Sequence, residues 1–420
     1  MINICFLCEY YPPSIMGGAE VCLETLINSL SKLDIKIYVL TPNYRAFKEE
    51  FEKKGNITIH RFKSLRYFLY KQRDKTQKAY KKNRPLFYLL LNQYIKFSAF
   101  ELAKKLESIA KTNKFSIVHS NNIESLIALS SAKVDAKKIA HIRDCTTFCL
   151  GFKTIGNKFC SECNPKNISK CLNAGSVLSS LIYSDIIKRR RRKFNKIDYF
   201  FFINNFVKET LIKEKLVKKE QSLVVHDPLN FKVISKLSKE KAKKKLGIKA
   251  NKVALFVGSL TYIKGAQFLP ELIKRLEDVH FVVVGDGPLC SKINRIKAKN
   301  LTYKKYIDNR KISDYYKAAD VFLYPVTIHP GWGLTATEAL ANSTPIIAFD
   351  TKGVREGIPK GCGALVKLND INAFSSKVEE FAKKGTRSNQ CKKISKKIRE
   401  LHNPDKIAKG MLDIYKKVSK

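Results

Sequence analysis

The sequence has no long apolar run: none of its hydrophobic stretches approaches the roughly 20 residues that a membrane-spanning helix needs. The first residues, MINICFLC, lack the charged leader of a secretory signal, and EYYPPS follows them directly. A short apolar segment of this kind is typical of a buried strand. From these absences we expect a cytoplasmic protein, either soluble or peripheral at the inner face of the cell membrane.

Acidic residues are scarce. The chain has 37 Asp and Glu and 80 Lys and Arg, which gives a formal net charge of +43. Such a charge attracts nucleic acid, anionic lipid head groups or phosphorylated substrates. It also arises when a whole proteome is rich in lysine, so composition alone does not choose among these explanations. The chain has no recognition motif of a known nucleic-acid-binding module, and its cations are spread rather than focused. We therefore expect no nucleic acid as a partner.

The cysteine count of 11 is odd, which does not suit a disulfide framework. Cys5, Cys8 and Cys22 lie in apolar segments, as reduced core thiols do, and this favours a reducing compartment. A second group includes Cys160 and Cys163, whose Cys-x-x-Cys spacing is that of half a zinc site. The group predicts either a structural zinc or free thiols. Its candidate ligands are Cys145, Cys149, Cys160, Cys163 and Cys171.

Strand-like and helix-like segments alternate along the chain. INICFLC, IKIYVLTP and FSIVHSNN are typical of strands, and the pattern restarts near residue 251 with KVALFVGSL, HFVVVGDGPL, AADVFLYPV and TPIIAFD. This alternation predicts parallel sheets covered by helices, and 420 residues are too many for one core. We expect two doubly wound α/β domains, 1–225 and 226–390, and C-terminal helices at 391–420 that pack back across both. Insertions are expected at about 62–105 and 145–175.

One stretch, HPGWGLTATEALANSTPIIAFD at 329–350, puts a glycine-flanked loop before a helix that carries Glu338 about one turn in. Glycine lets a backbone come close to a ligand, and a helix N-terminus favours an anion. In open α/β sheets, ligands bind beyond the carboxyl ends of the strands. Glu338 is therefore placed to accept two hydroxyl hydrogen bonds, as a ribose offers. The alternative is that it only stabilises the helix N-terminus, by about 1 kcal/mol or less.

GWGLTATEALANSTPIIA resembles the donor-site motif E-G-F-G-L-x-x-x-E-A-x-A-x-G-x-P of the retaining GT-B glycosyltransferases of family four. YYPPSIMGGAEVCLETL, IVHSNN, VGSLTYIKG and VVVGDGPL resemble other motifs of that family, in the same order, over Met1 to about Asp350. The resemblance implies a GT-B fold, with two Rossmann-like domains that face each other across a cleft. It also implies transfer of a hexose from a UDP- or GDP-hexose donor, with retention of configuration and no cofactor required. The implied acceptor is a polysaccharide, a lipid-linked glycan or a glycoprotein glycan.

The resemblance also assigns residues, with Lys264, Glu338 and Asp144 in catalytic positions. Glu338 would hold the ribose, and Lys264 would neutralise the leaving diphosphate, whose negative charge grows in the transition state. The alternatives are a solvated lysine at 264 and an ordinary glycine loop at 17–18. The implied donor-binding residues are Gly17, Gly18, Gly258, Ser259, Lys264, Gly285, His329, Gly331, Trp332, Gly333, Leu334 and Glu338. The implied acceptor or sugar contacts are His141, Arg143 and Asn121.

Three positions depart from the family pattern. The first glutamate of the motif falls on Pro330, where His329 is the nearest hydrogen-bonding substitute. The arginine that usually precedes the lysine falls on Ser259, and the histidine of the first domain falls on Arg143, two residues after His141. These departures leave the sugar open and permit a second interpretation, a catalytically weak glycosyltransferase-like scaffold.

Residues 65–100 mix Tyr, Phe and Leu with many cations. A basic helix with an aromatic face lies well in an anionic membrane interface, which would suit a lipid-linked acceptor. The alternative is a helical insertion that packs its apolar side on its own domain. The run KRRRRK at 188–193 either belongs to the same surface or is a solvated charge run.

Overall fold

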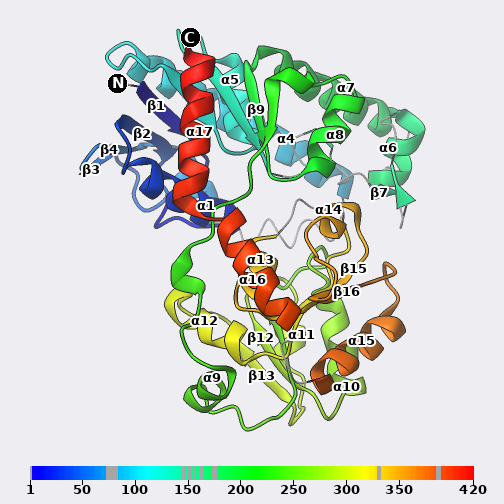
Figure 1. The fold of residues 1–420 in the computed structure, drawn as a ribbon. Coiled ribbons are helices and arrows are strands. Elements are labelled where there is room, and N and C mark those ends of the chain that lie inside the picture. The colour runs from blue at the N-terminus through cyan, green and yellow to red at the C-terminus, as the bar shows by residue number, and fades with distance from the viewer. Residues whose placement is uncertain are drawn as a thin grey trace. The chain divides into compact units, whose positions relative to one another are not determined.

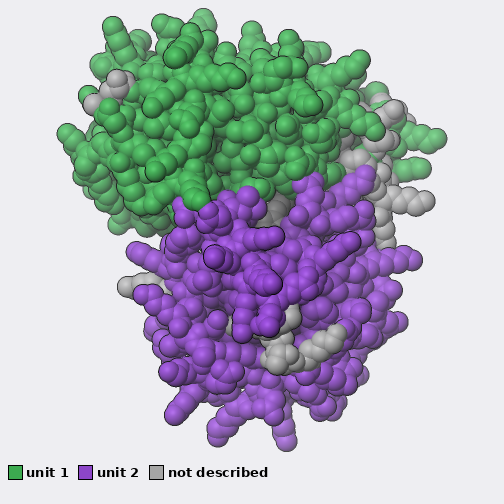
Figure 2. All heavy atoms as spheres, in the orientation of Figure 1, with its two compact units in different colours: residues 1–228, 404–420 green, residues 229–403 purple. Residues whose placement is uncertain are grey.

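A computed structural model describes residues 2–71, 84–143, 145, 148–149, 154–155, 158–160, 164–172, 177–328, 333–384 and 389–420. The chain divides into two compact units, which Figure 2 distinguishes by colour. Unit 1 consists of residues 1–228 and 404–420, and unit 2 of residues 229–403. Each unit has its own sheet and its own hydrophobic core.

Unit 1 is built on a sheet in which, among the described residues, only the edge pair β3–β4 is antiparallel (Figure 1). In spatial order its strands are β10 (Ser222–Val224), β9 (Tyr199–Phe202), β6 (Lys137–Ile142), β5 (Ile117–Ser120), β1 (Ile2–Leu7), β2 (Ile35–Pro42), β4 (Ile57–Phe62) and β3 (Glu50–Lys54). A short hairpin, β7 (Thr154–Ile155) with β8 (Lys158–Phe159), lies outside the sheet. The helices are α1 (Gly18–Leu30), α2 (Arg66–Lys71), α4 (Arg84–Ala110), α5 (Ile123–Ser131), α6 (Pro165–Leu172), α7 (Val177–Arg192), α8 (Asn205–Lys213) and α17 (Pro404–Ser419).

Successive side chains of a strand point to opposite faces, so the apolar run of β1 serves two cores. Cys5 and Leu7 pack with residues of α4, α5 and α8, whereas Ile4 and Phe6 pack with residues of α1 and α17. The continuous hydrophobicity of MINICFLC thus reflects a strand buried on both faces, as parallel sheets require. Helix α17, red in Figure 1, returns at the end of the chain to lie along α1.

Unit 2 has a six-stranded sheet that is parallel throughout its described residues. In spatial order the strands are β13 (Leu301–Lys304), β12 (His280–Val284), β11 (Val253–Val257), β14 (Val321–Tyr324), β15 (Ile346–Phe349) and β16 (Gly363–Val366). In chain order this is 3-2-1-4-5-6, the arrangement of a dinucleotide-binding sheet. The helices are α9 (Lys239–Lys245), α10 (Leu269–Arg275), α11 (Cys290–Asn294), α12 (Asn309–Ala318), α13 (Leu334–Ala341), α14 (Lys352–Arg355), α15 (Ile371–Lys384) and α16 (Asn389–Leu401).

The core of unit 2 follows the same alternation. From β11, Val253 and Leu255 pack with α12, α13 and α16, while Ala254 and Phe256 pack with α10 and α15. The predicted pair of doubly wound α/β domains is therefore confirmed. The last two helices belong to different units, because α16 packs on α13 in unit 2 and α17 packs on α1 in unit 1.

Within the described ranges, no helix combines the length and the apolar character needed to cross a bilayer. A disulfide joins Cys362 to Cys391, and this pairing was not expected from the sequence. Most of the other described cysteines are buried. Cys362 and Cys391 meet because α16 packs back on the sheet, and a separation of 29 residues gives no sign of it.

Candidate active site

The strand order of unit 2 reverses between β11 and β14, and the loops that leave the carboxyl ends of these two strands are joined to each other. The backbone amide of Thr327 donates to the carbonyl of Ile263 at 3.1 Å, and its hydroxyl donates to the carbonyl of Tyr262 at 3.1 Å. Loops at such a reversal form the ligand crevice of open α/β sheets. Several predicted donor-binding residues lie on these loops.

Lys264 lies in the β11 loop, half-buried. Its amide donates to the Thr261 hydroxyl at 3.3 Å, and the next residue, Gly265, has a φ of +76°. A Cβ at Gly265 would collide with the Pro325 carbonyl at the end of β14. Only glycine tolerates both that φ and that approach, so the position of Lys264 is fixed against β14.

Gly258 directly follows β11, Gly285 directly follows β12, and the backbones of the two glycines are in contact. The Gly258 amide donates to the Val284 carbonyl at 3.0 Å, and a Cβ at Gly285 would collide with the Gly258 carbonyl. This contact accounts for both glycines through packing. Their role in donor binding, and that of the exposed Ser259, stay predictions.

Glu338 lies in α13, directly after the β14 loop, with a side chain that is nearly buried. Its Oε2 accepts a hydrogen bond from the hydroxyl of Tyr316 at 2.7 Å. Burial raises the pKa of Glu338 to about 7, and the Tyr316 hydrogen bond acts in the opposite direction. Gly333 is the N-cap of α13, so the first amides of the helix, including that of Leu334, lie at the same edge of the sheet.

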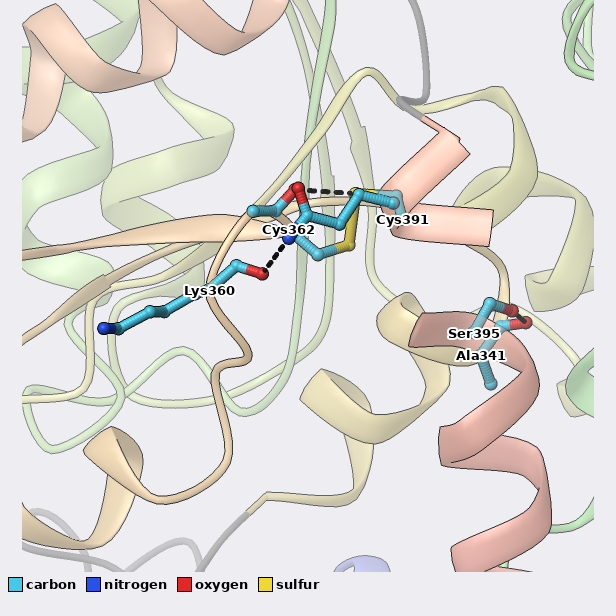
Figure 3. The surroundings of a disulfide bond; sticks show 7 residues. Ala341, Lys360, Cys362, Cys391 and Ser395 are labelled. Carbon is cyan, nitrogen blue, oxygen red and sulfur yellow. Dashed lines mark hydrogen bonds between the residues drawn. A yellow bond between two sulfur atoms is a disulfide. The ribbon is translucent and has the colours of Figure 1, made fainter. Parts of the chain in front are cut away.

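The far end of α13 is held by α16, as Figure 3 shows. The Ser395 hydroxyl donates to the Ala341 carbonyl at 2.7 Å, and the Arg399 guanidinium donates to the same oxygen at 2.7 Å and 2.9 Å. The Cys362–Cys391 disulfide ties the beginning of α16 to the start of β16. The helix that carries Glu338 is thus fixed at its C-terminus.

In unit 1 the structure brings Asn121 and Arg143 together beyond β5 and β6. The guanidinium of Arg143 donates to Asn121 Oδ1 at 3.0 Å and 3.1 Å and forms an ion pair with Asp227. Asn121 is buried, and its Nδ2 has no hydrogen-bond partner among the described residues. These two residues form a polar group at the carboxyl edge of the sheet, where a ligand hydroxyl can accept from Asn121.

His141 is buried in the core. Its ring packs 5.7 Å from that of His119 and 6.0 Å from that of Phe201. Burial, together with the charge of Arg143, holds its pKa well below the usual value, so the imidazole is neutral. In the described part of the chain neither of its ring nitrogens has a hydrogen-bond partner. A contact of His141 with the acceptor stays a prediction.

Gly17 and Gly18 begin α1 and are exposed. The carboxylate of Glu20 accepts from the amides of Gly17 at 2.8 Å and Met16 at 3.3 Å. This is the reciprocal contact of a capping box, in which the N3 glutamate satisfies amides that precede the helix. A phosphate that uses these amides would have to displace Glu20.

Asp144, His329, Gly331, Trp332 and Cys163 lie outside the described residues. Cys145, Cys149 and Cys160 are buried, and Cys171 is half-buried. The described residues contain no group of three or more metal-ligating side chains. Because the predicted zinc site includes Cys163, it stays a prediction.

Three residues that matter to these sites were missed in the sequence. Tyr316 and Asp227 had no signal in the sequence. Tyr316 contacts Glu338, 22 positions away, and Asp227 contacts Arg143, 84 positions away, and contacts over such separations leave no local pattern. Glu20 had one, because a glutamate three residues after Gly17 fits the capping-box spacing.

The comparisons with known proteins agree on one class. The profile of the family Glycosyl transferases group 1 matches residues 238–400. The chain is 22% identical to an uncharacterized glycosyltransferase of Methanocaldococcus jannaschii, over 97% of this chain and 96% of that protein.

Two solved structures extend the likeness to the whole fold. Sucrose-phosphate synthase of Thermosynechococcus elongatus has a TM-score of 0.69 at 17% identity, covering 100% of this chain and 99% of that one. HepE of Anabaena in complex with UDP-glucose has a TM-score of 0.63 at 15% identity, covering 99% and 100%. The chain is therefore a glycosyltransferase with the GT-B fold, and its residues 238–400 match the group 1 family.

Proposed function

We propose that the protein transfers a hexose from UDP- or GDP-hexose to a glycan or lipid-linked acceptor, with retention of anomeric configuration. The observation that supports this most strongly is the joined pair of loops at β11 and β14. Lys264 lies on the β11 loop, and Glu338 lies in α13, the helix that follows β14 in the chain. A bound UDP-glucose in HepE is in keeping with a nucleotide-sugar donor.

In this proposal each residue has one task. Glu338 Oε1 accepts from the ribose hydroxyls, while the Tyr316 hydroxyl donates to Oε2. The first amides of α13 contact the sugar and phosphates, because a helix N-terminus favours an anion. As the bond between the anomeric carbon and the phosphate oxygen breaks, its electron pair stays with the diphosphate, and Lys264 stabilises that charge. The acceptor hydroxyl oxygen forms the new bond on the same face of the anomeric carbon, and its proton passes to the departing diphosphate. In unit 1, Asn121 and Arg143 contact the acceptor, and no metal is required.

The test is a panel of UDP-, GDP- and ADP-hexoses, measured by binding and then by release of nucleoside diphosphate with glycan acceptors. We expect one base to bind and the product to keep the anomeric configuration of the donor, as read by NMR. If no donor in the panel binds, the transfer proposal fails and the scaffold interpretation replaces it. An inverted product would contradict retention alone.

Tyr316→Phe tests the role of Glu338 through pH. Ribose hydroxyls donate to the ionised carboxylate, so donor affinity should rise as pH increases through the pKa of about 7. The Tyr316 hydrogen bond lowers that pKa, and its loss should move the midpoint to higher pH. We expect affinity at pH 7 to fall about two- to fivefold, most of it recovered at pH 9. Calorimetric titration across pH measures this.

Tyr315→Phe is the matched control, because Tyr315 is the neighbouring half-buried tyrosine of α12. In Tyr315→Phe, the pH midpoint of donor affinity should be the same as in the wild type. An unmoved midpoint in Tyr316→Phe would show that Glu338 does not govern donor binding.

A further inference from the structure

Unit 1 exposes an unusual set of large apolar side chains. Phe47, Leu65, Phe68, Phe97 and Phe100 have exposed fractions between 37% and 61%. We call these five residues, with Lys63, Lys96 and Lys104, the aromatic patch. Single exposed apolar residues are ordinary, but a contiguous group marks an interaction site.

Contacts join Phe47, Lys63 and Phe68, and a hydrogen bond links Leu65 to α4, the helix that carries the other members of the patch. The rings of Phe47 and Phe68 lie 4.9 Å apart, and Lys63 Nζ lies 4.4 Å from the centroid of Phe47. The amide of Leu65 donates to Glu101 of α4 at 3.1 Å. This bond joins the segment before α2 to the turn of α4 that carries Phe100. The opposite face of α4 is buried, with Leu102 and Leu106 in the core, so α4 packs on its own domain and still presents aromatic rings.

The charge of the patch selects its partner. Lys63, Lys96 and Lys104 are exposed, and Lys104 Nζ lies 5.9 Å from the centroid of Phe100. Of the neighbouring acids, Glu101 accepts from Ser64 and Leu65 and pairs with Arg66. Glu107 pairs with Lys104 at 3.0 Å, so the excess positive charge of the patch rests on Lys63 and Lys96. Lysine is depleted in protein–protein interfaces, whereas lysine beside exposed aromatic rings suits anionic lipid head groups.

The patch lies at the ligand edge of the unit 1 sheet. Phe47 follows the carboxyl end of β2 and Lys63 follows that of β4, as Asn121 follows that of β5. Arg66, next to Leu65, forms an ion pair at 3.3 Å with Glu124 in the first turn of α5, the helix that begins two residues after Asn121. A bilayer on the patch would thus lie beside the candidate acceptor residues.

We propose that the aromatic patch docks unit 1 on an anionic lipid bilayer and that the acceptor is lipid-linked and taken from that bilayer. The inference rests on the proposed transfer reaction for the acceptor, but the docking itself does not depend on it.

The experiment uses the full chain and vesicles of phosphatidylcholine, alone or mixed with phosphatidylglycerol, in a sedimentation assay. The test variant is Phe47→Ser/Phe68→Ser/Phe97→Ser/Phe100→Ser. The control, Phe231→Ser/Tyr306→Ser, removes exposed aromatic residues of unit 2. The wild type and the control should bind the anionic vesicles, less so at high salt, and the patch variant should bind at least about tenfold more weakly. Thermal unfolding checks that all three are folded.

Equal vesicle binding by the patch variant and the wild type would overturn the docking proposal, as would no binding by the wild type. The docking proposal would also be overturned if the wild type forms a dimer that the patch variant does not form, and the wild type does not bind lipid. If a folded patch variant does not form, Lys63→Glu/Lys104→Glu replaces it, with the same expected loss.

The acceptor is tested separately, with a vesicle-borne glycolipid and a short soluble analogue. The patch variant should lose rate only on the glycolipid and should keep its affinity for the nucleotide. Equal loss on both acceptors would overturn the lipid-linked acceptor. If the wild type binds vesicles but no nucleotide sugar, the transfer proposal fails and the docking proposal stands.

Discussion

Lys264→Ala is expected to lower kcat by about 10²- to 10³-fold, which is the usual effect of removing one preorganised group that stabilises transition-state charge. The diphosphate carries more negative charge in the transition state than in the bound donor, so an ammonium beside it accelerates the reaction selectively. Lys264 is suited to this because Thr261, Thr327 and Gly265 fix its loop. Steady-state kinetics with the preferred donor measure the change.

The free energy of unfolding of Lys264→Ala, measured by thermal denaturation, should stay within about 0.5 kcal/mol of that of the wild type, as for other partly exposed positions. Lys274→Ala, an exposed lysine of α10, is the control and should keep full kcat. Lys264→Arg should recover part of the rate, since it restores the charge with a different geometry. A KM effect without a kcat effect would mean that Lys264 binds the donor equally in the ground and transition states.

The alternating strands and helices could be predicted because burial on both faces leaves continuous apolar runs. KVALFVGSL contains β11, and TPIIAFD contains β15. The loop before Glu338 was expected at the ligand edge by the same rule, since ligand-binding loops leave the carboxyl ends of parallel strands. Lys264 was assigned by the resemblance to the family motif.

Long-range pairing could not be predicted. Glu338 is easily identified in the sequence, but its bond to Tyr316 depends on how α12 and α13 pack. The charge run KRRRRK was expected to be solvated or part of a surface, and this is wrong for Arg190. Arg190 is buried and donates to Asn92 at 3.2 Å, while Arg191 pairs with Glu214. A local run of charge does not reveal which members face an interior acid or amide.

Arg66→Met is expected to reduce the free energy of unfolding of unit 1 by about 3–5 kcal/mol, the cost of breaking a buried ion pair from one side. Arg66 is fully buried and pairs with Glu124 at 3.3 Å. It also donates to the Ser98 carbonyl at 2.6 Å and to the Tyr44 hydroxyl at 3.1 Å. Burial alone would lower the pKa of Arg66, but Glu124 together with Tyr44 and Tyr94 outweighs it and holds that pKa above the usual value.

Removal of the guanidinium leaves Glu124 beside the equally buried Glu9, whose Oε1 accepts from the Glu124 amide at 2.5 Å. Burial already raises the pKa of both acids, and without Arg66 their repulsion should raise it further. Part of the lost stability should therefore return at low pH, where both carboxyls are protonated. Denaturant unfolding at pH 5 and pH 8 measures this difference.

Arg189→Met is the control, because Arg189 is exposed and pairs only across one turn of α7 with Asp185 among the described residues. An exposed pair of this kind contributes at most about 1 kcal/mol. Arg66→Lys distinguishes charge from geometry, since a lysine keeps the charge but cannot reach Glu124, Ser98 and Tyr44 with one planar fork. If Arg66→Met and Arg189→Met unfold alike, the buried charges near α5 contribute nothing to the stability of unit 1. The link from the aromatic patch to the acceptor edge would then have no energetic basis.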